Sequence, residues 1–218
     1  MAMPSQTPNE PVRLVPATER ATGPLAGDPG ILGLPRFIVG SVALGLVGIG
    51  VLPAATTGSA VPLVLAVAAV GLFLATVWSA AVGQTAAAGI YGIFGGFYIS
   101  YAVLYLGLVY NWFGLRPIQF VATEKVFMIS WLVVITMLVV ATLRLPVIFT
   151  ALFTLVDAAV LLNLLSIIQN GSSTLLKAAG WVVMAFSALG IYLFMSSASH
   201  ATGGREFPPG RPILRTHT

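Results

Sequence analysis

The sequence predicts an all-α, polytopic membrane protein with six transmembrane helices and both termini in the cytoplasm. Three observations lead to this fold class. First, 58% of the 218 residues are hydrophobic and only 7% are charged, whereas soluble domains carry about 25% charged residues. Second, the apolar residues gather in six runs, each close to the roughly 20 residues that cross a bilayer. Third, the basic residues lie mainly in the loops and at the ends of the chain, so their charge reports membrane topology and not nucleic-acid binding.

Six apolar runs are expected to form the transmembrane helices. They lie at about 31–52, 61–83, 86–110, 126–143, 145–168 and 174–197. Turn-forming residues separate most of the runs, at 53–60, 111–125, 144–146 and 169–173. The second break depends on Gly83 and Gln84 alone, and if the chain does not turn there the topology beyond it inverts.

The three parts of the chain differ in composition. Residues 1–27 are rich in Pro, Thr, Glu and Ala and show no sustained hydrophobic period, so a disordered cytoplasmic tail is expected. Residues 28–198 hold the six runs and form the membrane domain, and residues 199–218 form a second cytoplasmic tail.

The basic residues orient the six runs, because cytoplasmic loops near membrane ends carry an excess of Lys and Arg. If both termini lie on one side, that side carries seven basic residues, Arg13, Arg20, Arg36, Arg144, Arg205, Arg211 and Arg215. The opposite side carries three, Arg116, Lys125 and Lys177. This asymmetry favours cytoplasmic termini and a multi-pass protein of the cytoplasmic (inner) membrane, surrounded by lipid.

Residues that would support enzyme chemistry are missing from the runs. The chain contains no cysteine, and its two histidines, His200 and His217, lie near the carboxyl terminus. It also has no paired carboxylates and no phosphate-binding glycine loop. No metal site, cofactor or enzymatic activity is therefore expected.

The third run combines an aromatic face with a face of small residues. Its aromatic residues follow helical spacing on one side, at Tyr91, Phe94, Tyr98, Tyr101 and Tyr105. On another side, Gly92 and Gly96 allow close approach of a neighbouring helix. The aromatic residues are interpreted either as tight helix packing or as the wall of a narrow passage.

The first run has its own packing face and a punctuated start. Gly45 and Gly48 follow Ser41 at helical spacing and are expected to pack against another helix. At the start of the run, Asp28 precedes Pro29, a typical arrangement for a helix amino terminus.

The fifth run contains an acidic residue near its middle. A charge at the position of Asp157 costs about 2.5–3.5 kcal/mol by insertion measurements, so burial favours the protonated acid. Thr150 and Thr154 share its face and form a polar stripe with it. Asp157 is interpreted as a hydrogen-bonded link between helices, as a proton or substrate site, or as the sign of a misplaced boundary.

Several segments resemble, in order and spacing, the motifs of one known family. At the start, DPGILGLPRF (28–37) follows N-P-A-P-L-G-L-x-x-F, with Asp28 in place of the asparagine. ATVWSAAVGQT (75–85) follows A-G-x-W-E-F-x-x-G-N-T, with Ser79 in place of the glutamate. IFGGFY (93–98), AGW (179–181) and IYL (191–193) follow three later motifs. Together these segments resemble the acetate uptake transporter family, also called the succinate–acetate permeases.

The resemblance implies a six-helix, channel-like permease for small monocarboxylates, chiefly acetate and in the wider family succinate, assembled as a homo-hexamer with one pathway per subunit. It implies a hydrophobic constriction from the first, third and fifth helices, at the positions of Phe37, Phe94 and Leu155. An ionised Asp28 at the mouth of such a pathway would repel a carboxylate within a Debye length of roughly 8–10 Å.

Apart from Asp28, the groups available to a permeating solute are uncharged. The expected pathway residues are Asp28, Gln84, Thr85, Tyr91, Tyr98, Thr150 and Thr154, which supply hydroxyls and one amide but no fixed positive charge at membrane depth. This favours either conduction of the anion through weak binding sites or passage of the neutral acid. A more specific alternative is transport coupled to protons through Asp157. The competing interpretation is a non-transporting membrane subunit or scaffold, in which the same faces pack against a partner.

Overall fold

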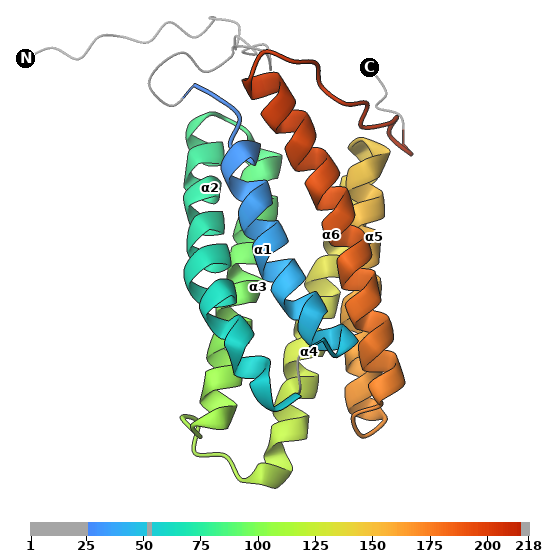
Figure 1. Cartoon of the computed structure of the whole chain (residues 1–218). Coiled ribbons are helices and arrows are strands. Elements are labelled where there is room, and N and C mark those ends of the chain that lie inside the picture. The colour runs from blue at the N-terminus through green and yellow to red at the C-terminus, as the bar shows by residue number, and fades with distance from the viewer. Residues whose placement is uncertain (1–25, 52–53, 215–218) are drawn as a thin grey trace, which may run out of the picture.

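The computed structural model describes residues 26–51 and 54–214, which form a bundle of long helices (Figure 1). The helices are α1 (Gly30–Ile49), α2 (Val70–Ala81), α3 (Thr85–Val109), α4 (Pro117–Ala141), α5 (Val147–Ile168) and α6 (Ser173–Ala201). A 3-10 segment (Ala54–Ala60) and a π segment (Leu63–Ala69) precede α2, and a 3-10 turn (Thr142–Arg144) follows α4. Residues 1–25 and 215–218, which hold most of the predicted amino-terminal tail and His217, lie outside the described part.

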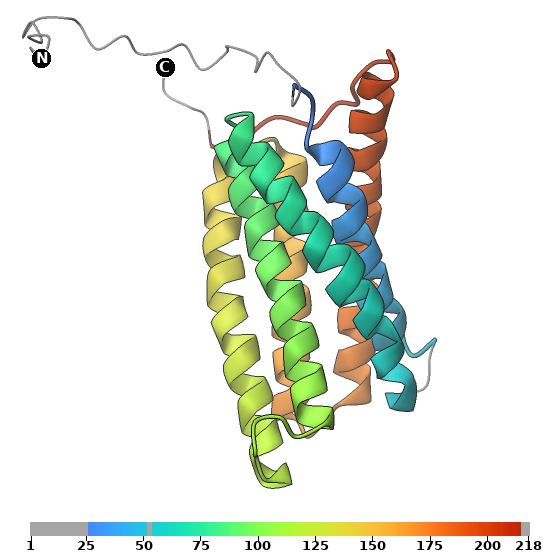
Figure 2. The same cartoon turned by 90° about the vertical axis from the view of Figure 1, so that its left-hand side faces the viewer.

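The predicted all-α fold with six membrane spans is confirmed. Six helical stretches are long and apolar enough to cross a membrane, with Thr57–Ala81 counting as one span. Successive spans run in opposite directions, and both ends of the described chain lie at the same end of the bundle (Figure 2). We call this end, which includes Asp28 and Leu214, the cytoplasmic end, following the distribution of basic residues.

The fourth helix begins at Pro117, nine residues before the start expected from hydropathy at residue 126. Arg116 is extended, and proline is favoured in the first turn of a helix because its missing N–H is not needed there. The Gln119 side chain accepts a hydrogen bond from the Arg116 N–H at 2.9 Å and closes the start of the helix. Glu124 and Lys125 therefore lie within α4, although their polarity lowers the local hydropathy.

The chain turns between α2 and α3, as the two-residue signal at Gly83 and Gln84 predicts. Gly83 has a φ of +77°, a conformation that glycine adopts at little cost. The Gln84 N–H donates to the Ser79 carbonyl at 2.8 Å, which satisfies one of the last carbonyls of α2. This turn makes α2 and α3 antiparallel neighbours.

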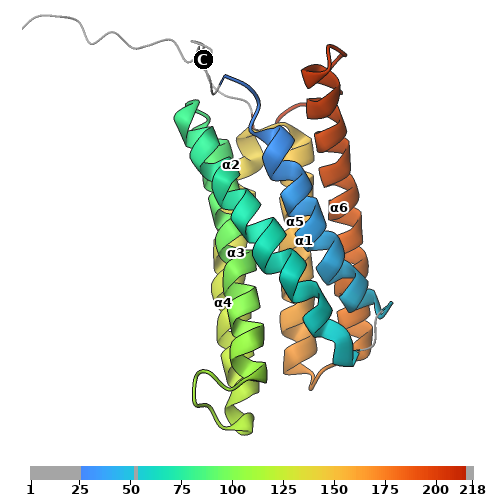
Figure 3. The same ribbon diagram turned by 60° about the vertical axis from the view of Figure 1, so that its left-hand side comes forward.

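The backbones of α1 and α6 approach each other closely, and Figure 3 shows α1 between α2 and α6. A Cβ atom at Gly180 would lie 2.5 Å from the Ile49 nitrogen and 2.7 Å from the Gly48 carbonyl carbon. In the same way, a Cβ atom at Gly48 would lie 2.9 Å from the Gly180 Cα atom. Glycines thus let two backbones touch, which is a common basis of helix association in lipid.

Candidate functional site

A cavity of about 1290 Å³ lies at the cytoplasmic end of the bundle. Its walls come from the start of α1, the α2–α3 turn, the starts of α3 and α5, the end of α6 and the segment that follows α6. Its polar side chains are those of Asp28, Gln84, Tyr91, Tyr192, Ser196, Ser197, His200 and Glu206. No Lys or Arg lines it among the described residues. We refer to it as the cytoplasmic cavity.

Four buried phenylalanines lie beneath this cavity, and we call them the phenylalanine cluster. They are Phe37 from α1, Phe94 from α3, Phe153 from α5 and Phe186 from α6. The Phe37 and Phe94 rings meet edge to face with centroids 4.8 Å apart. Phe153 stacks on Phe94 at 5.6 Å, and Phe186 lies 5.7 Å from Phe37. Such ring pairs add about 0.5–1.5 kcal/mol each beyond burial, so the cluster is held in place by its own contacts.

A second cavity, of about 120 Å³, lies on the other side of the cluster and is called the inner cavity here. Phe37 and Phe94 line both cavities, and Phe186 lines the inner one. The polar residues in the inner wall are Ser41, Tyr98, Tyr101 and Asn163. Its described lining contains no charged residue, so a solute there would meet hydroxyls, one amide and apolar side chains.

A hydrogen-bond chain fixes the position of Phe37. The Tyr98 hydroxyl donates to the Phe37 carbonyl at 3.0 Å and lies 2.7 Å from the Ser41 hydroxyl. Because the single Tyr98 proton is used on the carbonyl, Ser41 is the donor to the Tyr98 oxygen. Gly40 makes room for the ring, since a Cβ atom there would lie 2.7 Å from the Tyr98 Cζ atom. The network thus connects α1 and α3 directly below the cluster.

Replacing Tyr98 by phenylalanine is expected to destabilise the bundle by about 1–3 kcal/mol, because a buried carbonyl and a buried hydroxyl lose their partner. Thermal unfolding of the detergent-solubilised protein measures this change. Tyr110→Phe is the matched control, because Tyr110 is 67% exposed at the end of α3 and should tolerate the loss of its hydroxyl. Equal melting temperatures for the Tyr98 variant and the wild type would contradict the role given to this network.

The structure brings together about half of the residues singled out for the pathway. Asp28, Gln84 and Tyr91 line the cytoplasmic cavity with Phe37 and Phe94, and Tyr98 lines the inner cavity. The other residues line neither of these two cavities, and they are Thr85, Thr150, Thr154, Leu155 and Asp157. On α5, the cytoplasmic cavity is lined by Phe149, Leu152 and Phe153, and the inner cavity by Val156, Ala159, Val160 and Asn163, whereas Leu155 lines neither.

The polar stripe of α5 makes hydrogen bonds within the protein. The Thr136 hydroxyl of α4 donates to the Asp157 carboxyl at 2.8 Å. Thr150 donates to the Thr142 carbonyl, also at 2.8 Å, and Thr154 donates to the Thr150 carbonyl. Thr136 is exposed and Asp157 half-buried, so their contact lies at the periphery of the bundle. This placement fits the interpretation of Asp157 as a hydrogen-bonded link between helices.

The four glycines expected at helix contacts differ in how closely they are approached. A Cβ atom at Gly45 would lie 2.9 Å from the Met184 sulfur, and one at Gly48 would touch the α6 backbone. At Gly92 and Gly96 the nearest atoms, from Thr76 and Trp131, would lie 3.5 and 3.4 Å away. The two α1 glycines therefore sit at the tighter contact, and the two α3 glycines have nearly ordinary van der Waals space.

Phe153 and Phe186 were not found by the sequence reasoning. Phe186 is spaced seven residues from both Ala179 and Leu193, and all three are buried, so this heptad spacing on α6 is a signal that could have found it. Phe153 carries no comparable signal, because α5 is apolar on nearly every side.

Comparisons with known proteins agree with the fold. The sequence model of the GPR1/FUN34/yaaH family matches residues 12–204. One similar solved structure is described as the structure of the bacterial acetate channel SatP. The chains share 19% sequence identity and a TM-score of 0.71, over 88% of this chain and 99% of that one. None of the curated proteins compared with the chain matches it. The family match covers most of the sequence, and the chain therefore belongs to the GPR1/FUN34/yaaH family, the acetate transporter family whose motifs its sequence resembles.

Proposed function

We propose that this protein is a channel-like permease for small monocarboxylates of the acetate class. The observation that carries the proposal is that Phe37 and Phe94 line two cavities at once, with their rings 4.8 Å apart. A solute moving from the cytoplasmic cavity to the inner cavity has to pass these rings. Family membership and the likeness to a structure described as an acetate channel support the same solute class.

The phenylalanine cluster is the proposed constriction. It supplies no hydrogen-bonding side chain, so a solute has to shed most of its water there, and a hydrophobic constriction of this kind gates by dewetting. The polar groups on either side, Gln84 and Tyr91 above and Ser41 below, offer hydrogen bonds before and after the dry step. Succinate has two carboxylates to dehydrate and is expected to pass less readily than acetate.

The proposed setting is the cytoplasmic membrane, with copies of the chain assembled as a homo-hexamer and one pathway in each. The resemblance to the family suggests the hexamer. The exposed apolar side chains of α4, such as Val126, Val133 and Met137, suit lipid as well as a neighbouring copy, so the hexamer rests on the resemblance. Chemical cross-linking and mass measurement of the purified complex distinguish six copies from fewer, or from an assembly with another protein.

Flux through reconstituted protein tests the proposed function. Labelled acetate is measured in proteoliposomes against protein-free vesicles, because neutral acetic acid crosses lipid unaided. We expect acetate flux above that background and little flux of benzoate, whose ring is as large as those of the constriction. If neither solute exceeds the protein-free rate, the protein is better regarded as a non-transporting membrane subunit or scaffold.

Proton coupling through Asp157 is tested in the same assay. Because the Asp157 carboxyl lines neither cavity and accepts a hydrogen bond from Thr136, we expect Asp157→Asn to keep the response of acetate flux to an inward proton gradient. If a folded Asp157→Asn variant loses that response, Asp157 takes part in proton coupling after all.

A further inference from the structure

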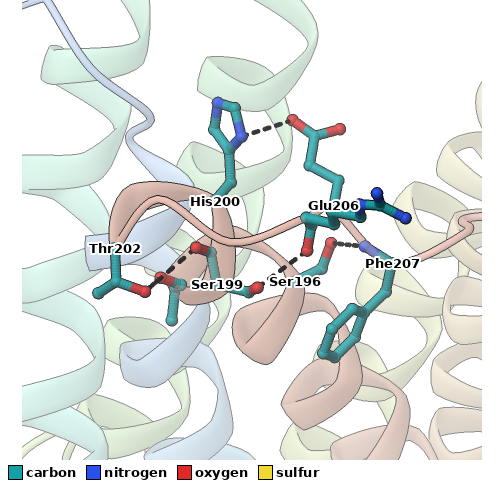
Figure 4. Close-up of polar contacts among 8 residues, drawn as sticks. Ser196, Ser199, His200, Thr202, Glu206 and Phe207 are labelled. Atoms are coloured by element: carbon teal, nitrogen blue, oxygen red, sulfur yellow. Dashed lines mark hydrogen bonds and ion pairs between the residues drawn. The ribbon is translucent and has the colours of Figure 1, made fainter.

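The segment after α6 crosses the cytoplasmic end of the bundle, and we call residues 203–214 the C-terminal strap. On its α6 side, the Phe207 N–H donates to the Ser196 hydroxyl at 2.8 Å, as Figure 4 shows. The Tyr192 hydroxyl donates to the Pro208 carbonyl at 3.1 Å, and its ring packs on Phe207 with centroids 5.5 Å apart. Both contacts hold the strap against the rim of the cytoplasmic cavity.

The strap is also attached to the other side of the cavity, at the start of α5. The Ile148 N–H donates to the Pro209 carbonyl at 3.4 Å, and the Leu214 N–H donates to the Leu143 carbonyl at 3.0 Å. Gly210 has a φ of +81°, and a Cβ atom there would lie 2.5 Å from a Val147 methyl group. The strap is therefore fixed at both ends across the cavity rather than attached at one end.

The strap brings a negative charge into the cavity wall. The lining includes Glu206, Phe207 and Pro209 of the strap, together with Asp28, which precedes α1. His200 also lines the cavity, and its Nδ1 atom lies 3.6 Å from a Glu206 carboxyl oxygen (Figure 4). The described lining contains no Lys or Arg, and the two arginines of the strap, Arg205 and Arg211, are not among its residues.

We propose that the C-terminal strap is a selectivity element of the pathway, which uses Glu206 together with Asp28 to disfavour anions relative to uncharged solutes of the same size. The inference rests on the proposed function and deepens it, because it names the uncharged acid as the form that the cytoplasmic cavity admits more readily. A carboxylate entering this cavity meets two like charges, of which the half-buried Asp28 is screened less by water and salt than the exposed Glu206.

The expected size of the effect follows from screened Coulomb repulsion. Removing one like charge about 8–10 Å from an anion is expected to raise anion entry about threefold at physiological ionic strength, where the Debye length is about 8 Å. Removing both charges should raise it about tenfold, because the two contributions multiply. Both increases in anion entry should become smaller in high salt. An increase caused by altered packing would not depend on salt in this way.

The test measures two solutes of nearly equal size, with the full-length protein reconstituted in planar bilayers for one and in vesicles for the other. Acetate anion is followed as a current across planar bilayers well above the pKa of acetic acid, and acetamide is followed by stopped-flow light scattering. The readout is the ratio of acetate to acetamide permeation. Glu206→Gln and Asp28→Asn keep the shapes of the side chains, and an asparagine oxygen at position 28 can still accept the hydrogen bond that Asp28 accepts from the Gly30 N–H at 2.8 Å.

Two further variants separate charge from structure. Glu206→Asp keeps the charge and should keep the low ratio of the wild type, whereas His200→Lys adds a fixed positive charge beside Glu206 and should raise the ratio about as much as Glu206→Gln does. Both positions are exposed, with side chains 68% and 62% accessible, so neither change is expected to affect folding.

The possible results distinguish this inference from the proposed function. A raised, salt-dependent ratio in Glu206→Gln and His200→Lys, but not in Glu206→Asp, supports the role of the strap. If the wild type conducts acetate but all variants keep its ratio, the strap has no part in selectivity and the proposed function stands. If the wild type passes neither solute above protein-free membranes, both proposals fall.

Discussion

Gly180→Val is expected to prevent the six-helix bundle from assembling in its native form. The Gly180 position meets the α1 backbone directly, with a Cβ atom placed 2.5 Å from the Ile49 nitrogen. Backbone atoms cannot rotate away as a side chain can, so α1 and α6 would have to separate. Overpacking typically costs about 1–3 kcal/mol and occasionally more, and we expect this variant at or above the upper limit. Size-exclusion profiles and melting temperatures in detergent measure the loss.

Gly89→Val is the matched control for that experiment. Gly89 also lies within a membrane-spanning helix, but a Cβ atom there would have no neighbouring atom within 4 Å. We therefore expect a monodisperse profile and a melting temperature near that of the wild type. If the two valine variants behave alike, the close approach of α1 and α6 is not what holds the bundle together.

Phe94→Ala is expected to change which solutes pass. Its ring lies between the two cavities and contacts both Phe37 and Phe153, so its removal joins the cavities through a wider opening. We expect benzoate flux to rise at least about tenfold, equivalent to about 1.4 kcal/mol in the barrier, with a smaller change for acetate. Parallel flux assays in proteoliposomes measure both solutes.

Stability has to be controlled in this variant, because removing a buried phenylalanine costs about 3–5 kcal/mol. Phe94→Leu keeps most of the volume and should widen the opening less, giving an intermediate benzoate flux. Phe73→Ala removes an aromatic ring that lines neither cavity and is 40% exposed on α2, so solute preference should not change. Unaltered benzoate exclusion in a folded Phe94→Ala protein would remove Phe94 from the constriction.

The sequence was sufficient for the fold because each span is long, apolar and bounded by turn residues. It was less informative about which side of each helix faces the cavities. In a helix each residue is rotated by about 100°, so Leu155 lies about 200° around α5 from Phe153, on nearly the opposite side. A soluble helix would show which side is buried by its polar residues. Here lipid and protein both accept apolar side chains, and the polar stripe of α5 does not mark the side that lines the cavities.

The start of α4 and the position of Asp157 show the same physical difficulty. Hydropathy falls at Glu124 and Lys125, yet the backbone stays helical from Pro117 because helix geometry does not depend on polarity. The free energy needed to place a charged Asp157 in lipid suggested a role in the pathway. In the structure, however, the carboxyl accepts a hydrogen bond from Thr136 and lines neither cavity. Neither the start of α4 nor the hydrogen bond between Thr136 and Asp157 can be read from the local sequence.

The C-terminal strap was also out of reach of the sequence reasoning. Its proline- and glycine-containing sequence indicated a cytoplasmic tail, and nothing in residues 203–214 indicates contacts with α5, more than 50 residues away in the chain. By contrast, Phe37 and Phe94 could be singled out, because both lie in segments that resemble family motifs. The structure places these two residues together at the boundary between the cavities.

The most direct test of the proposed constriction uses the absence of cysteine from the chain. A single Phe94→Cys substitution gives one thiol, which a small methanethiosulfonate reagent can modify in proteoliposomes. Leu155→Cys on α5 serves as the comparison, and mass spectrometry measures the fraction modified in each variant. The account predicts that modification of Cys at position 94 stops acetate flux, whereas modification at position 155 leaves it unchanged. Undiminished flux through fully modified Phe94→Cys protein would contradict a pathway between these phenylalanines.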